Sequence, residues 1–175
     1  MSRREAHDDR AVAILETTAR ELLRYLERRL GTDDAPDALS ETMTVIWRRA
    51  SSIPSSDQDA RLWAFCVARN VILNFSRSRR RQDLLAERLR GTIDHGWVLD
   101  APSDVSLDVR AALDRLGPEL GELIRMVHWD GFSISEAAQI MSVPPSTARS
   151  RYQRAKRELS ELLMPQPTEG TLEIR

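Results

Sequence analysis

Apolar side chains recur at alternating intervals of three and four residues through most of this chain, which is the period of an α-helix. Residues 11–30 show the pattern first, with a stripe formed by Leu15, Ala19, Leu22, Leu26 and Leu30. Gly31 ends this segment. The Asp33 and Asp34 pair can cap a second helix, in which Pro36 is tolerated in the first turn. We predict that its buried face consists of Leu39, Met43, Ile46, Trp47 and Ala50.

A third helix follows the loop "SSIPSSDQD" and extends to about residue 81. One side carries the packing residues Leu62, Phe65, Cys66, Ile72 and Leu73. A second stripe, with helical spacing, consists of Trp63, Val67, Asn70, Asn74, Arg77 and Arg81. An aromatic ring, amides and guanidinium groups in one line suit stacking on bases and holding phosphates. A merely solvated polar face is the alternative.

Periodicity fails after residue 90, and helical patterns resume at residue 107. We predict an all-α fold of two small helical domains, residues 1–90 and 107–164, joined by a flexible linker at 91–106 and followed by a tail at 165–175.

The second domain contains the most specific local pattern. Ser133 and Glu136 have the spacing of a capping box, "SVP" makes a tight connection, and Pro145 can begin the last helix. A short helix, a tight turn and a helix that begins with small polar and basic residues predict a helix-turn-helix. A helical hairpin with a charged outer face is the alternative.

Charge is distributed in blocks, although the whole chain has a net charge of -1. Residues 61–90 carry a net charge of +6 and residues 91–130 a net charge of −5. Residues 149–157 are basic again. Two separated basic stripes predict two surfaces that face phosphates, and solvated helix faces are the alternative.

Catalysis has no support in the sequence. The three histidines, at positions 7, 95 and 128, fall in unrelated segments without metal-ligand spacing, and no Gly-rich phosphate loop is present. Cys66 lies in an apolar run and is interpreted as a packing residue. We predict a protein that is not an enzyme, with no cofactor and no metal. No apolar stretch reaches the length of a membrane span or of a signal peptide, which predicts a cytoplasmic protein without membrane insertion.

Taken together, these segments resemble a bacterial RNA polymerase sigma factor of the extracytoplasmic-function type. "DAPDALSETMTVIWRRA" is similar to the part of region two that grips the beta-prime clamp helices of the polymerase. "RLWAFCVARNVILNFSRSRRR" is similar to the helix that opens the minus-ten element. Residues 112–159 resemble region four, which reads the minus-thirty-five element.

The resemblance implies a role for particular residues. It assigns polymerase binding to Asp37, Ser40, Glu41 and Thr44. It assigns the minus-ten element to Trp63, Asn70, Asn74, Arg77, Arg79, Arg80 and Arg81, beside a loop at 53–59 that captures a flipped-out base. It assigns the minus-thirty-five element to Ser146, Thr147, Arg149, Ser150, Arg151 and Arg154. The implied partners are core polymerase, through its beta-prime clamp helices and beta flap, promoter DNA, and in many family members an anti-sigma factor.

Another function class stays open at this point. A stand-alone helix-turn-helix regulator would bind an operator as a dimer, with residues 1–90 as a dimerisation or sensing module. That class predicts tight duplex binding by the protein alone, whereas a sigma factor predicts specific binding only together with polymerase. The stripe from Trp63 to Arg81 favours the sigma factor, because a dimerisation helix has no need of two amides followed by an arginine run.

Overall fold

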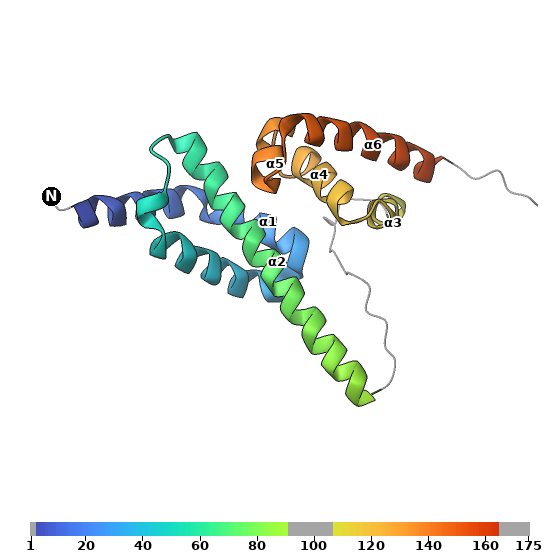
Figure 1. Ribbon diagram of the computed structural model, residues 1–175, viewed down its shortest axis with the longest axis horizontal. Coiled ribbons are helices and arrows are strands. Elements are labelled where there is room, and N and C mark those ends of the chain that lie inside the picture. The colour runs from blue at the N-terminus through green and yellow to red at the C-terminus, as the bar shows by residue number, and fades with distance from the viewer. Residues whose placement is uncertain (1–2, 91–106, 165–175) are drawn as a thin grey trace, which may run out of the picture.

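The computed structural model describes residues 3–90 and 107–164, and all of its regular structure in these ranges is helical (Figure 1). In chain order the elements are α1 (Arg3–Arg48), the short 3-10 helix η1 (Ala50–Ser52), α2 (Asp57–Arg90), α3 (Leu107–Arg115), α4 (Pro118–His128), α5 (Ile134–Met141) and α6 (Pro145–Leu163). The predicted all-α fold of two helical parts is confirmed. The predicted linker at 91–106, with His95, and the tail at 165–175 lie outside the described residues.

The helix α1 is bent sharply at Gly31. This residue has φ 80° and ψ 170°, a backbone conformation that a side chain disfavours and that glycine adopts readily. The two legs of α1 therefore fold back beside each other, and α2 crosses them (Figure 1). The break predicted at Gly31 is confirmed. The second leg begins directly after Gly31, so the predicted cap by Asp33 and Asp34 is wrong, because both residues already lie within the helix. Pro36 is the fifth residue of this leg and lies inside the helix, not in its first turn as predicted.

The core of the first half forms where the legs of α1 pack on α2. Its fully buried residues include Leu22, Tyr25, Leu26, Ile46 and Phe65. The prediction that Trp47 is buried is wrong, because this side chain is 47% exposed. The reason is angular: Ala35, Ala38, Thr42 and Ile46 form the buried stripe of the second leg, and Trp47 lies about 100° further around the helix.

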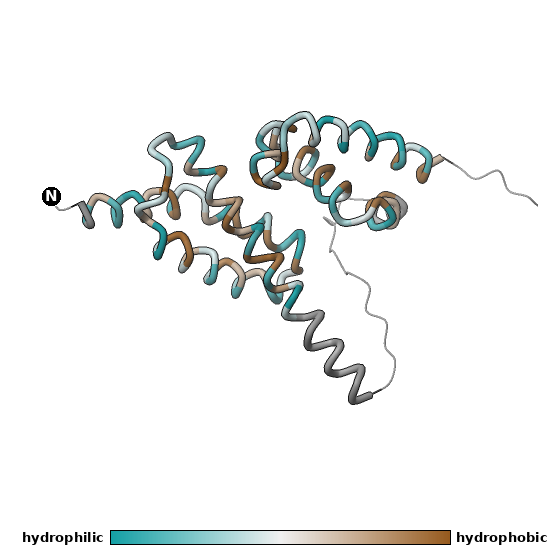
Figure 2. The backbone as a smooth tube through the Cα atoms, in the orientation of Figure 1, coloured by the Kyte–Doolittle hydropathy of each residue, from teal (hydrophilic) through white to brown (hydrophobic). Residues whose placement is uncertain are grey.

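The second half, α3 to α6, contains the predicted helix-turn-helix. Ser133 Oγ accepts from the Glu136 backbone N–H at 3.2 Å, and a Glu136 carboxylate oxygen accepts from the Ser133 N–H at 2.8 Å, so the capping box is present. Ser142 then ends α5 in the left-handed conformation with φ 56°. Ala148 and Ala155 seat α6 on the core of this half. Brown and teal residues lie on opposite sides of several of these helices in Figure 2, as expected for helices with one buried face.

The two halves pack directly against each other, which the sequence did not indicate. The Phe65 ring on α2 meets the Phe132 ring before α5 edge to face, with centroids 4.9 Å apart. Tyr25 stands against the other side of Phe65 at 5.2 Å. The Arg61 guanidinium covers both Phe65 and Phe132. The first half therefore shares one apolar core with α4 and α5.

Ion pairs close the same contact. Arg29 on α1 is buried, and its guanidinium lies over the Tyr25 ring. It donates through Nε to Glu122 on α4 at 2.9 Å and through Nη2 to Asp130 at 2.7 Å. Arg28 also pairs with Asp130. Although burial disfavours the charged form, Glu122, Tyr25 and Asp130 raise the pKa of Arg29, so this guanidinium stays charged.

Candidate nucleic-acid and protein interfaces

The residues predicted to bind polymerase lie together on the second leg of α1. Asp37, Ser40, Glu41 and Thr44 are all exposed. The Ser40 hydroxyl donates to the Pro36 carbonyl at 3.0 Å, and the Thr44 hydroxyl donates to the Ser40 carbonyl at 2.9 Å. Both hydroxyls therefore bond back along their own helix, and the two carboxylates are the charged groups that the face presents.

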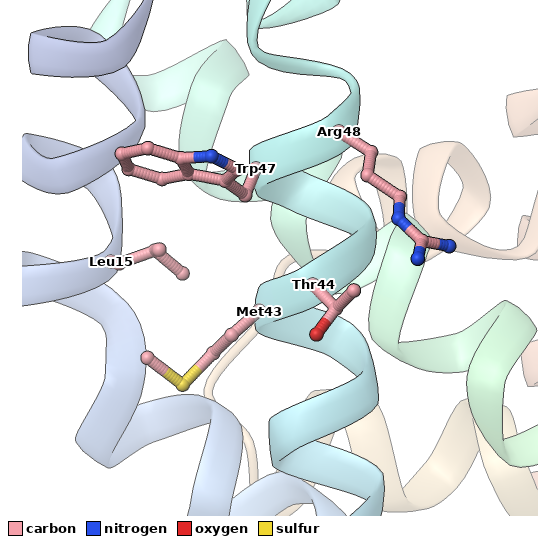
Figure 3. Close-up of a pocket in the computed structure, with 5 residues that line it drawn as sticks. All are labelled: Leu15, Met43, Thr44, Trp47 and Arg48. Atoms are coloured by element: carbon pink, nitrogen blue, oxygen red, sulfur yellow. The ribbon is translucent and has the colours of Figure 1, made fainter.

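Trp47 continues this face and was missed as a surface residue. It lines a pocket of about 340 Å³ with Leu15, Met43, Thr44 and Arg48. The side chains of Leu15, Met43 and Trp47 lie in the gap between the two legs of α1 (Figure 3). Thr44 lies four residues after Ser40, and Trp47 lies three residues after Thr44. This helical spacing in the sequence could have placed Trp47 on the outward face. An acidic strip with an exposed aromatic residue at one end has the chemistry of a protein interface.

The amides of the third predicted helix are available on α2. Asn70, Asn74 and Arg77 are exposed. Trp63 is half-buried and packs against the core, whereas Val67, predicted on the same stripe, is only 6% exposed. Arg79, Arg80 and Arg81 lie on α2, and their side chains fall outside the described part of the structure. The structure thus places Trp63, Asn70, Asn74 and Arg77 along one side of the helix.

The other sides of α2 explain why this one is open. Ala60, Ala64 and Ala68 face the core with α1. Arg61, Phe65 and Cys66 face the second half, where the Cys66 thiol lies 3.6 Å from the Gln139 carbonyl. Burial raises the pKa of the Cys66 thiol, which suits a packing residue more than a reactive one. Packing of the two halves therefore leaves the amides of α2 uncovered.

The start of α6 presents the predicted duplex contacts. Ser146, Arg149 and Ser150 are exposed and Thr147 is half-buried. Pro144 and Pro145 have no backbone N–H and no side chain caps the helix, so the first N–H groups of α6 are those of Ser146 and Thr147, which have no acceptor within the helix. A helix start with free N–H groups, hydroxyls and an exposed guanidinium can bind a phosphate.

Two of the predicted contact residues already have carboxylate partners. Arg151 pairs with Glu119 of α4 at 2.8 Å, and Arg154 pairs with Glu158 one turn along α6 at 2.6 Å. Glu119 is 62% exposed and Arg154 is 65% exposed, so these pairs are weak and screened. A phosphate can replace either carboxylate at small cost. Arg149 is exposed at the start of the same helix.

Residues 3–90 and 107–164 contain no group of three or more His, Cys, Asp or Glu side chains arranged to hold a metal ion. None of the helices described there combines the length and apolarity that crossing a membrane requires. His128 lies on the surface, where its Nε2 is 3.0 Å from the Tyr152 hydroxyl and the two rings stack.

Comparisons with known proteins give both halves a family. Residues 14–82 match "Sigma-70 region 2", and residues 106–159 match "Sigma-70, region 4". The chain is 30% identical to the ECF RNA polymerase sigma factor SigL of Mycobacterium tuberculosis over 157 residues, which is 84% of this chain and 85% of that protein. It is 32% identical to EcfG of Rhodopseudomonas palustris over 136 residues, which is 75% of this chain and 72% of that protein.

Solved structures agree with the sequence matches. The sigma factor RpoE of Bartonella quintana, solved in complex with the anti-sigma factor NepR, shares 26% identity and superimposes with a TM-score of 0.62 over 85% of this chain and 93% of that one. CnrH, solved with the cytosolic domain of CnrY, has the same fold at 21% identity with a TM-score of 0.59. The superposition on CnrH covers 91% of this chain and 96% of that one. Both superpositions therefore include the two helical halves, and the operator-binding alternative does not account for this similarity. The chain belongs to the extracytoplasmic-function family of RNA polymerase sigma factors.

Proposed function

We propose that this sigma factor directs core RNA polymerase to its promoters through three separate surfaces, and that it catalyses no reaction itself. The observation that carries the proposal is that the three surfaces occur on one chain in family order, each with exposed polar side chains. We assign these surfaces to domains at residues 1–90 and 107–164, with a linker at 91–106 and a tail at 165–175. The proposed location is the cytoplasm, where polymerase and promoters meet.

The first surface docks on polymerase. Asp37, Ser40, Glu41 and Thr44 form an acidic polar strip on α1, and we add Trp47 at its end. The strip would bind the beta-prime clamp helices, since carboxylates select a basic partner and a desolvated aromatic ring supplies most of the affinity.

The second surface holds separated strands. Asn70 and Asn74 would hydrogen-bond to base edges that are exposed once the duplex is open, with Trp63 beside them. Arg77 and the arginines at 79, 80 and 81 would bind the strand backbone. Exposed amides on an otherwise well-packed helix support this assignment.

The third surface positions the enzyme on duplex DNA. Ser146, Thr147 and Ser150 would bind phosphate at the start of α6. Arg149, Arg151 and Arg154 would bind phosphates or guanine edges in the major groove. The beta flap of polymerase is the proposed partner of this half, and an anti-sigma factor is a proposed regulator, as in the complexes of the structural relatives.

The halves must separate for the second and third surfaces to act at once. Promoter elements at minus ten and minus thirty-five are about 25 base pairs apart, which is roughly 85 Å of B-DNA. In the packed arrangement α5 lies on α2, and α6 begins four residues after α5 ends. Even α2, with 34 residues, is only about 50 Å long. We propose that polymerase and promoter bind the separated form.

Run-off transcription tests the function directly. Purified core polymerase is assayed with and without the protein on upstream fragments from the same genome. Transcripts that need the protein and share two upstream elements are the expected result. Their absence, together with tight duplex binding by the protein alone, would instead support an operator-binding regulator.

A further inference from the structure

The loop that precedes α2 is tied to a distant part of the chain by one arginine. Arg10, on the first leg of α1, donates from Nη2 to the carbonyls of Ser55 at 2.9 Å and Pro54 at 3.1 Å. Its Nη1 pairs with Asp57 at 2.7 Å. One planar guanidinium thus binds three acceptors within four consecutive residues, 44 to 47 positions away in the sequence.

Other contacts hold the two ends of the loop, because Ile53 packs against the core and the Ser56 hydroxyl accepts the Asp59 N–H at 3.4 Å. Ile53 and Pro54 are half-buried, and Ser55 and Ser56 are exposed. The backbone N–H of Ile53 bonds to the Ala50 carbonyl at 3.3 Å, closing the 3-10 turn just before the loop. After the loop, Ser56 accepts the Ala60 N–H at 2.9 Å as α2 starts. Between these two points, Arg10 donates the hydrogen bonds that the carbonyls of Pro54 and Ser55 accept.

A cavity adjoins the start of α2, which follows the loop. A cavity of about 390 Å³ lies between the first leg of α1 and the start of α2, and Arg10, Asp57 and Arg61 are among its lining residues. The cavity therefore borders the pair of Arg10 and Asp57, whereas residues 54 and 55 do not line it. At those two residues the directional hydrogen bonds of Arg10 add to the packing of the neighbouring Ile53 against the core.

We propose that Arg10 is a positioning residue for base selection at the minus-ten element. By fixing the carbonyls of Pro54 and Ser55, it holds the loop at 53–59 in the shape that receives a flipped-out base. This inference rests on the proposed function of that loop, and it adds a residue that lies outside the matched region-two segment, which begins at residue 14. Arg10 acts through the loop and need not touch DNA.

The test is transcription from a promoter in which each minus-ten base is replaced in turn. For every position, output with the preferred base is divided by output with each replacement. Arg10→Ala is expected to lower this ratio by about tenfold at the base read by the loop, because a small misplacement of a positioning group costs much of its effect. Ratios at the minus-thirty-five element and the affinity for core polymerase should stay as in the unmodified protein.

Two further variants separate positioning from folding. Arg10→Lys keeps the charge, but one ammonium group cannot reproduce the planar fork, so part of the selectivity should return. Arg10→Gln replaces the charged guanidinium with a neutral amide that can still donate hydrogen bonds. It provides a second comparison if Arg10→Ala unfolds. Arg20→Ala, on the exposed side of the same leg, is the matched control and should keep every ratio.

Three results would overturn the inference. An unchanged ratio at all minus-ten positions in Arg10→Ala would show that the loop does not depend on Arg10. An equal fall at every position and in the minus-thirty-five ratio would indicate general loss of structure. A decrease of about one in the slope of log affinity against log salt concentration, measured for promoter binding by Arg10→Ala, would show that Arg10 contacts a phosphate directly. Absence of protein-dependent transcripts with unmodified protein would be a failure of the proposed function and is detected separately.

Discussion

Arg29 and Asp130 form an ion pair that joins the two halves of the molecule, at 2.7 Å, with both side chains only 2% exposed. They are 101 positions apart in the sequence. Glu122 satisfies a second edge of the guanidinium, and Arg28 also binds Asp130. Because neither charge is solvated by water, each one is stabilised mainly by its protein partners.

Removing one partner of this pair should destabilise the fold strongly. Asp130→Ala leaves the buried Arg29 guanidinium with Glu122 and the Tyr25 carbonyl but without the acceptor of its Nη2, and breaking a buried pair typically costs about 3–5 kcal/mol. Urea unfolding of the full chain measures the change. Glu119→Ala breaks the exposed pair with Arg151 and serves as the control, with an expected cost below about 1 kcal/mol. Equal losses in the two variants would contradict a special role of burial.

Locking the two halves together should block promoter use. Cys66 is the only cysteine of the chain and lies beside Gln139 of the second half. In Gln139→Cys, an oxidised disulfide would keep α2 on α5, and protein-dependent transcription should fall by about tenfold or more if only the separated form binds the promoter. Reduction of the same sample is the control and should restore activity. Full activity of the locked protein would show that separation is not required.

The polymerase-binding face can be tested by charge and by shape. Glu41→Arg reverses one of the two carboxylates of the acidic strip and should abolish co-purification with core polymerase. Trp47→Ala removes an exposed ring and should weaken that binding by about 2 kcal/mol, as expected for an aromatic anchor, with little effect on folding. Ile46→Ala, at the buried neighbouring position, should instead lower the free energy of unfolding and leave the polymerase-binding surface in place. Binding that survives both Glu41→Arg and Trp47→Ala would place the interface elsewhere.

The start of α6 should dominate duplex recognition. Arg149→Ala is expected to weaken holoenzyme binding by about 1–3 kcal/mol at one base pair if Arg149 reads a base, or evenly across sequences if it binds phosphate. Arg154→Ala should show a smaller loss because its pairing with Glu158 competes with DNA. Anisotropy titrations on promoters with single substitutions distinguish these outcomes. A loss confined to Lys156→Ala, further along the helix, would argue against this docking geometry.

The capping box predicts a specific loss of stability in acid. Hydrogen bonding by the Ser133 backbone holds the pKa of Glu136 below its ordinary value of 4.5. A carboxylate with a lowered folded pKa contributes its full stabilisation above the unfolded pKa and loses it as pH falls through the folded value. Between about pH 6 and pH 3, the unmodified protein should therefore lose more stability than Glu136→Gln, whose amide keeps the capping acceptor. Parallel pH profiles from urea unfolding would exclude this contribution.

Much of the local structure follows from the sequence because helices are encoded by nearby residues. The spacing of apolar residues, the glycine at 31 and the Ser133 and Glu136 pair act within one or two turns, so each is predicted from the sequence alone. The exposure of Asp37, Glu41, Asn70 and Asn74 also follows from helical spacing. Such features need no information about what a helix packs against.

What the tertiary structure decided is which side of each helix meets another element. Trp47 and Ile46 are adjacent and both apolar, yet only packing against the first leg and α2 determines that Ile46 is inside and Trp47 outside. Arg10 with the loop carbonyls, and Arg29 with Asp130, join residues more than forty positions apart. Their partners are set by the whole packed core, because charge and polarity alone leave many equally good pairings along a chain of 175 residues.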